Sequence, residues 1–204
     1  MQQHAYGKLF IYVDLHAHAN KRGCFMFGNS LTGDAHLKNT LFPRLVSLNS
    51  INFDYSECCF ADKLMNCKDK KDGLSREGCG RVALYKATQN PMCYTLECNY
   101  ASGKLKNTIT PKIIKSTGQV EPETDPVTDS TSAIYADKSL AAPPYTIEIF
   151  EDVGRAFCIA LLDQQEKNPV SRIPSTTFKN LEGVKNEVIS THKILIPRKP
   201  LIKT

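Results

Sequence analysis

The chain has 204 residues, of which 41% are hydrophobic and 23% charged, and it carries a net charge of +5. One globular domain with an apolar core is the expected organisation for this length and composition. The apolar run at residues 9–13 is too short to cross a bilayer, and the N-terminus has neither the cationic start nor the cleavage pattern of a signal peptide. These features lead us to expect a cytoplasmic protein with no membrane partner.

The first expected element is a buried strand at residues 9–13, which are rich in β-branched and aromatic side chains. Asp14, His16 and His18 follow it, and the alternation of side chains along a strand places all three on one face. A carboxylate and two imidazoles at a strand end form a candidate metal or acid–base site. Histidines with this spacing also occur at ordinary strand ends, where they serve only in hydrogen bonding, so both interpretations stay open.

Two basic residues, Lys21 and Arg22, open a loop that we expect across residues 21–33. Because they follow His16 closely, they are candidates for binding the carboxylates of a substrate. An exposed pair of cations is as easily explained by solubility, and the sequence does not decide between the two explanations.

Leucines mark the next expected element, a helix across residues 34–48. Their spacing of four, four and three places them on one apolar face, at Leu37, Leu41, Leu45 and Leu48. Residues 52–55 have the composition of a short strand, and residues 68–80 form a charged loop that contains glycine.

A second polar residue stands at an expected strand end. Residues 94–96 have strand character after a turn at Asn90 and Pro91, and Glu97 comes where that strand is expected to end. A glutamate in this position is most often a solvated surface residue. With a histidine-bearing strand end elsewhere in the chain, Glu97 is also a candidate general base beside a metal-bound water.

The second half of the chain differs in composition. Ser, Thr, Asp and Pro dominate residues 116–132, and such a segment buries too little apolar surface to offset its ordering entropy. We therefore expect a disordered insertion at residues 104–144, followed by a core helix at residues 145–167 with apolar residues at helical spacing. Residues 168–204 have few aromatic residues and several cations, which favours a flexible basic tail.

The net charge and the eight cysteines each suggest a class of protein that other features argue against. The positive charge is diffuse and no surface of alternating basic and aromatic residues is evident, so nucleic acid is an unlikely partner. An acidic protein tail would be attracted to the same charge. No secretory signal is recognisable in the sequence, and no two cysteines form a C-x-x-C pair. We therefore expect mainly reduced thiols rather than disulfides or a zinc knuckle.

Three ordered segments, DLHAHANKRGCFMFGN, GRVALYKA and YTLECNY, resemble the zinc carboxypeptidases, and specifically the cytosolic carboxypeptidase family. The sequences of these segments are most similar to the subgroup that removes branch-point glutamates from polyglutamylated tubulin. The resemblance implies an α/β fold with a mixed sheet and flanking helices, incomplete in this chain. It implies zinc as the cofactor, His16 as a zinc ligand, Glu97 as the catalytic base and Tyr85 as a mobile tyrosine that closes over the substrate.

The chain departs from the family in one respect. The family takes its first two zinc ligands from an H-x-x-E motif upstream of D-L-H-x-H, and none of the five histidines here is followed by glutamate at the third position. We therefore expect residues 1–167 to form the C-terminal part of a catalytic domain. His18 is expected to be a pocket wall or, as a second interpretation, a ligand, and Asp14 is expected to orient a ligand.

Two functions follow from this resemblance. The first is a zinc carboxypeptidase, of which this chain is a partial sequence, that removes glutamate from polyglutamylated tubulin or other glutamate-rich protein tails. The second is a catalytically inactive half-domain that binds tubulin or another acidic partner. In both cases we expect a cytosolic location, with microtubule association a possibility that the sequence leaves open.

Overall fold

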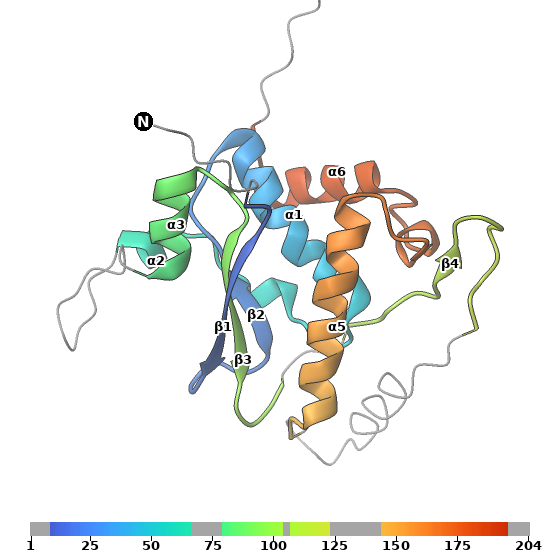
Figure 1. Ribbon diagram of the computed structural model, residues 1–204, viewed down its shortest axis with the longest axis horizontal. Helices are drawn as coiled ribbons and strands as arrows, with labels where there is room; N and C mark the ends of the chain where they lie inside the picture. Colours follow the sequence, from blue (N-terminus) through green and yellow to red (C-terminus); the bar gives the residue numbers. More distant parts are fainter. Residues whose placement is uncertain (1–8, 67–78, 104–106, 123–143, 196–204) are drawn as a thin grey trace, which may run out of the picture.

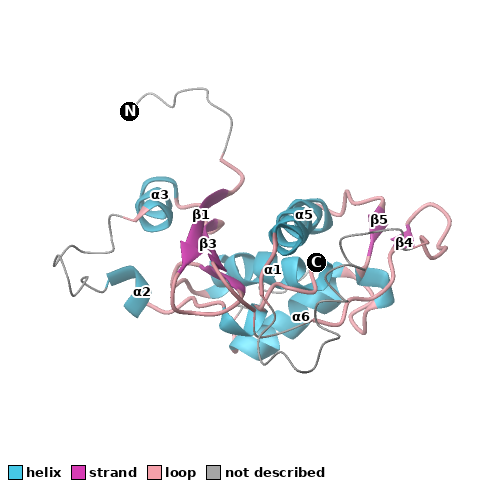
Figure 2. Cartoon of the chain, turned by 90° about the horizontal axis from the view of Figure 1, so that it is seen from below, coloured by secondary structure: helices cyan, strands magenta, loops and turns pink. Residues whose placement is uncertain are grey.

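The structure, a computed structural model, describes residues 9–66, 79–103, 107–122 and 144–195. In this part of the chain a three-stranded mixed sheet has helices on both of its faces (Figures 1 and 2). The predicted fold class, a mixed sheet with flanking helices, is confirmed. None of the described helices is long and apolar enough to cross a membrane.

The sheet has the strand order β1-β3-β2, so the strand that comes last in the sequence lies in the centre. β1 (Tyr12–His18) runs parallel to β3 (Cys93–Asn99), and β2 (Cys24–Phe27) runs antiparallel to β3. β3 is buried along almost its whole length, whereas β1 lies at an edge and is partly exposed. The central strand therefore holds the two segments that flank it in place.

Two expectations about this sheet are wrong. The first strand does not end at residue 13, because backbone pairing with β3 continues to His18 and includes the polar residues. Residues 24–27 form β2 instead of belonging to a loop, although their four apolar side chains show no alternation. Neighbours on both sides hold β2, since β3 pairs along one edge and single bridges to Phe53 and Cys59 lie on the other.

Two long helices cover one face of the sheet, and both confirm the helices expected from periodicity. They are α1 (Gly33–Asn49) and α5 (Ile147–Gln164), which pack against each other. α3 (Gly80–Thr88) lies on the opposite face, against β1 and β3 (Figure 2). Between the sheet and the two long helices the rings of three aromatic residues meet: Phe42, Tyr94 and Phe157.

A proline inside α1 connects this helix to the central strand. Pro43 has no backbone N–H, so the carbonyl of Asn39, four residues earlier, lacks its helical donor. The hydroxyl of Tyr94 in β3 donates to that carbonyl over 3.0 Å. The helix continues through the proline because the sheet supplies the missing hydrogen bond.

The expectation of a flexible tail from residue 168 is wrong for the described residues. The tail begins with β5 (Val170–Ser171) and contains α6 (Leu181–His192), which packs on α1. Val184 and Val188 are completely buried, and their spacing of four gives α6 an apolar face without any aromatic residue. Residues 196–204 lie outside the described part.

The expected insertion at residues 104–144 is described only in part. Residues 107–122 contain β4 (Ile113–Ile114), which pairs with β5, while residues 123–143 lie outside the described residues. The expected strand at residues 52–55 is wrong, because only Phe53 makes a bridge and a 3₁₀ turn follows. Most of the expected loop at 68–80 also lies outside the described residues. The remaining short helices are η1 (Tyr55–Glu57), α2 (Lys63–Asn66) and η3 (Ile173–Ser175).

Candidate functional site

The parallel pairing of β1 with β3 brings the expected site residues together. Asp14 lies opposite Thr95, His16 opposite Glu97 and His18 opposite Asn99. Opposite residues in neighbouring strands point to the same face of a sheet. The polar residues of both strands therefore share the face that α3 covers, although sequence reasoning had placed them at strand ends.

His16 and Glu97 form the centre of this face. The Nδ1 atom of His16 lies 3.6 Å from the Oε2 atom of Glu97, and the two side chains are 60% and 9% exposed. Oε2 is buried and accepts no hydrogen bond from the described residues. A carboxylate oxygen in this condition is costly to bury, and such orphaned groups are typical of catalytic sites or of sites for an ion or water.

The surroundings of Glu97 are largely apolar. Phe25 of β2 lies directly opposite Glu97, and Phe27 lies opposite Thr95. The rings of Phe25 and Phe27 are 5.4 Å apart. An apolar environment strengthens the electrostatic interactions of a carboxylate, since it lowers the local dielectric constant.

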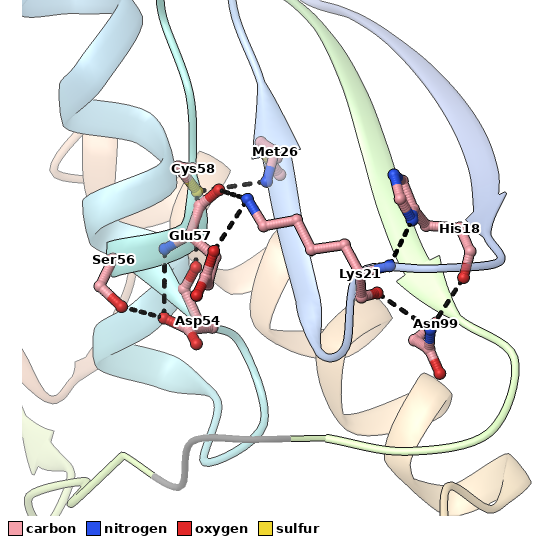
Figure 3. A network of polar contacts seen from close by, with 8 residues as sticks. All are labelled: His18, Lys21, Met26, Asp54, Ser56, Glu57, Cys58 and Asn99. Atoms are coloured by element: carbon pink, nitrogen blue, oxygen red, sulfur yellow. Dashed lines mark hydrogen bonds and ion pairs between the residues drawn. The ribbon is translucent and has the colours of Figure 1, made fainter.

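His18 fixes the turn that follows β1. Its Nδ1 atom accepts a hydrogen bond from the backbone N–H of Lys21 at 2.8 Å (Figure 3). It accepts a second one from the backbone N–H of Asn20 at 3.2 Å. Its ring packs edge-on against Phe25 and Phe27. The Nδ1 atom of His18 is thus engaged by the backbone, and both of its expected roles, pocket wall and ligand, stay predictions.

Lys21 is held in an ion pair rather than extending freely from the surface. Its Nζ atom lies 2.9 Å from the carboxylate of Glu57 and 2.7 Å from the Glu57 carbonyl oxygen (Figure 3). It also lies over the ring of Phe25. Binding of a substrate carboxylate by Lys21 would compete with Glu57. Arg22 is exposed. The substrate-binding roles of Lys21 and Arg22 stay predictions.

Arg81 is a residue of this site that sequence reasoning missed. It lies in the first turn of α3, is only 5% exposed, and donates from Nη1 to the hydroxyl of Thr95 over 3.3 Å. Its guanidinium also lies 5.8 Å from the ring centre of Phe27. The signal that could have indicated it is its position in GRVALYKA, one helical turn before Tyr85.

Tyr85 also comes from α3. It is half-buried, and its spacing of four from Arg81 places both side chains on one side of the helix. Because α3 packs on β1 and β3, this side of the helix adjoins the face that carries His16 and Glu97. The structure therefore puts Tyr85 in the same region, while its closing movement stays a prediction.

The described residues do not complete a metal site by themselves. No group of three or more His, Cys, Asp and Glu side chains within these ranges is arranged to hold a metal ion. A catalytic zinc ion needs three protein ligands, and this face offers one exposed imidazole, that of His16. The other ligands would have to come from outside the described residues.

Comparison with known proteins identifies relatives of one kind. The chain is 44% identical to human cytosolic carboxypeptidase-like protein 5 over 175 residues, which cover 85% of the chain and 18% of that protein. It is 42% identical to the zebrafish (Danio rerio) protein of the same name over 180 residues, 87% of the chain and 19% of that protein. Human cytosolic carboxypeptidase 6 is 26% identical over 178 residues.

The match covers most of this chain but a small part of each relative. The chain spans 18–19% of the length of the carboxypeptidase-like relatives named above. No protein-family model matches the chain. The chain belongs to the cytosolic carboxypeptidase family.

Proposed function

We propose that the chain carries part of the active site of a zinc carboxypeptidase that removes C-terminal or branch-point glutamate from polyglutamylated proteins such as tubulin. One observation supports this most directly: the Oε2 atom of Glu97 is buried, accepts no hydrogen bond from the described residues, and lies 3.6 Å from the exposed imidazole of His16. A carboxylate held in this state is available to accept a proton. The names of the relatives favour the cytosol as the location.

In this proposal Glu97 is the general base of peptide hydrolysis. It takes a proton from the attacking water and returns it to the leaving amine, and such general acid–base catalysis contributes ~10²–10⁴-fold to the rate. His16 supplies one ligand to zinc, whose other ligands come from residues outside the described ranges. When bound, the ion would polarise the scissile carbonyl.

Arg81 supports glutamate as the substrate residue. A guanidinium binds a carboxylate with two parallel hydrogen bonds, and this interaction is strongest away from water. Arg81 is buried on the face that carries Glu97, where it lies beside Thr95 and Phe27. We propose that it contacts a carboxylate of the substrate and that Tyr85, one turn later, closes over the same group.

The catalytic role can be tested on a protein that contains this chain together with an H-x-x-E segment, since the sequence itself has none, by measuring bound zinc and glutamate released from a polyglutamylated peptide. Glu97→Gln is expected to reduce release by at least ~10²-fold, because the amide cannot accept the proton. Glu182→Gln is a matched control, since Glu182 is an exposed residue of α6, the helix that packs on α1. Release that is unaffected by Glu97→Gln would contradict the proposal.

The substrate role of Arg81 needs a readout that a purely structural role would not change. We expect Arg81→Gln to reduce the preference for a peptide ending in glutamate over one ending in glutamine, because the mutant side chain lacks the positive charge. Lys167→Gln, at an exposed position after α5, serves as the comparison. A preserved preference in Arg81→Gln would assign glutamate recognition to other residues.

The second candidate function is an inactive half-domain that binds tubulin or another acidic partner. The absence of a three-ligand group among the described residues favours it. This function predicts no bound zinc and no glutamate release, together with peptide binding that weakens as salt concentration rises. Zinc binding with Glu97-dependent release would exclude it.

A further inference from the structure

Two cysteines lie side by side on adjacent strands of the sheet, next to Glu97. Cys24 of β2 and Cys98 of β3 are directly opposite residues of the antiparallel pair. Since Cys98 follows Glu97 in β3, its side chain points to the other face of the sheet, toward α5. Cys24 is completely buried, and Cys98 is half-buried.

The backbone pairing places these cysteines at a position that suits a disulfide. The N–H of Asn99 donates to the Gly23 carbonyl over 3.0 Å, and the Cys24 carbonyl accepts from Asp54 instead of from β3. Cys24 and Cys98 are therefore a non-hydrogen-bonded pair, in which the Cα atoms lie about 4.5 Å apart. Disulfides span Cα separations from about 4.4 Å upward, so the bond can form with little backbone movement.

The two thiols already interact. The neighbouring Cys98 raises the pKa of Cys24, and Cys24 lowers the pKa of Cys98. Cys98 also lines a surface pocket of about 340 Å³ together with Leu15, Val153 and Gly154. A small reagent can therefore reach Cys98 first, while Cys24 lies behind it.

We propose that Cys24 and Cys98 are a redox-active pair that forms a reversible disulfide when the protein meets a peroxide. The Cys98 thiolate attacks one peroxide oxygen and the O–O bond breaks, which gives a sulfenic acid and hydroxide. The proton that Cys98 released on ionisation joins this hydroxide, so that water leaves. The Cys24 sulfur then attacks the Cys98 sulfur, its proton joins the departing hydroxide, and a second water leaves. Two thiols are oxidised and one hydrogen peroxide is reduced to two waters.

The bond would connect the two strands that form the wall behind the site. β2 carries Phe25, opposite Glu97, and the disulfide would fix the register of these two residues one position away. Neither the pairing nor the pocket depends on the proposed hydrolytic function. The inference therefore stands or falls independently of that function.

The test is peptide mapping of the native 204-residue chain after exposure to hydrogen peroxide. A Cys67→Ser background removes the one cysteine that lies outside the described residues. We expect loss of alkylation at Cys24 and Cys98 together, a linked peptide pair containing both, and recovery with a dithiol reductant. Oxidation of Cys98 without a link to Cys24, or a link to another cysteine, would overturn the proposal.

Two variants sharpen this result. Cys158→Ser, at an exposed position of α5, should leave the linked peptide unchanged. Cys24→Ser should abolish the link and leave Cys98 at the sulfenic or sulfinic stage, because no resolving thiol remains. If peroxide still blocks alkylation of Cys98 in Cys24→Ser, but no sulfenic or sulfinic form of Cys98 is detected, the mechanism is contradicted.

Discussion

Glu97 combines two properties that usually exclude each other in a stable fold, burial and a carboxylate oxygen that accepts no hydrogen bond from the described residues. Burial of a polar atom without a donor costs about 1–3 kcal/mol. Residues that carry such a cost in a native structure are concentrated at functional sites. The thermodynamic effect of replacing Glu97 therefore distinguishes a functional residue from a structural one.

We expect Glu97→Gln to leave the free energy of unfolding unchanged or slightly increased, because the substitution removes a buried charge that the fold only partly compensates. Chemical denaturation of the mutant and wild-type chains measures this directly. A loss of more than about 1 kcal/mol would show that Glu97 makes a stabilising interaction, since that is the size of a typical net hydrogen bond.

The residues of the site differ in how far the sequence could predict them. His16 and Glu97 stand out because polar residues interrupt apolar strands. Their direct juxtaposition depends on the register of two strands from distant segments, which no local pattern specifies. Arg81 was missed because an arginine at a helix start is normally exposed, and only the packing of α3 on the sheet buries it.

Among the elements, α5 is connected to its neighbours by a buried carboxylate. Asp163 accepts hydrogen bonds from Asn49 of α1 at 2.8 Å, from Asn168 at 2.8 Å and from Ser171 of β5 at 2.7 Å. Three separate segments thus meet at one side chain that is 2% exposed. This interaction explains why the chain beyond α5 folds back onto the domain.

We expect Asp163→Ala to lower the free energy of unfolding by about 3 kcal/mol or more, because three buried donors lose their acceptor. Chemical denaturation gives the stability, and limited proteolysis should show faster cleavage beyond residue 168. Glu166→Ala, an exposed site near the end of α5, is the control. Equal stability of the Asp163 and Glu166 mutants would contradict this account.

The contact between α1 and α6 contains two histidines. The rings of His36 and His192 are 5.6 Å apart, and the Tyr55 hydroxyl lies 2.8 Å from Nε2 of His192. Burial lowers the pKa of His36, and the neighbouring His192 lowers it further. Burial also lowers the pKa of His192, while Glu187 opposes this shift.

Stability should therefore decrease in acid. A lowered pKa means that the unfolded chain binds protons more readily than the folded chain, so stability is complete above about pH 6.5 and falls as the pH drops below it. Chemical denaturation across this range tests the effect. His192→Gln should reduce the pH dependence of the free energy of unfolding. If this mutant shows the same dependence as the wild-type chain, other groups cause it.

The elements that the sequence predicted are those with enough local pattern. The leucines of α1 and the apolar spacing of α5 identify these helices over four or more turns. β2 has four residues and no alternation, so only its partner strand determines it. α6 was missed because its apolar face consists of aliphatic residues within a polar segment.

At the scale of the whole molecule, β1 forms one edge of the described sheet. Leu15 in this strand is 77% exposed, and Leu9 and Phe10 just before it are also exposed. An edge strand with exposed apolar residues offers unpaired backbone groups to other chains. The isolated chain is therefore expected to self-associate.

We expect Leu15→Lys to reduce this association without loss of folding, because a charge on an edge strand opposes intermolecular pairing. Static light scattering against concentration measures the association, and circular dichroism verifies the fold. Leu195→Lys is the matched control, since Leu195 is 88% exposed but lies outside the sheet. Association that persists equally in both variants would assign it to another surface.

The alternation of side chains along β3 gives this strand two chemistries, separated by one residue. Glu97 faces His16 with a carboxylate, and Cys98 faces the opposite layer with a thiol. Deletion of one residue within β3 before Glu97 would reverse the parity of the strand and put a thiol beside the imidazole. The number of residues within β3 therefore keeps the proposed proton transfer and the proposed thiol oxidation on separate faces of the sheet.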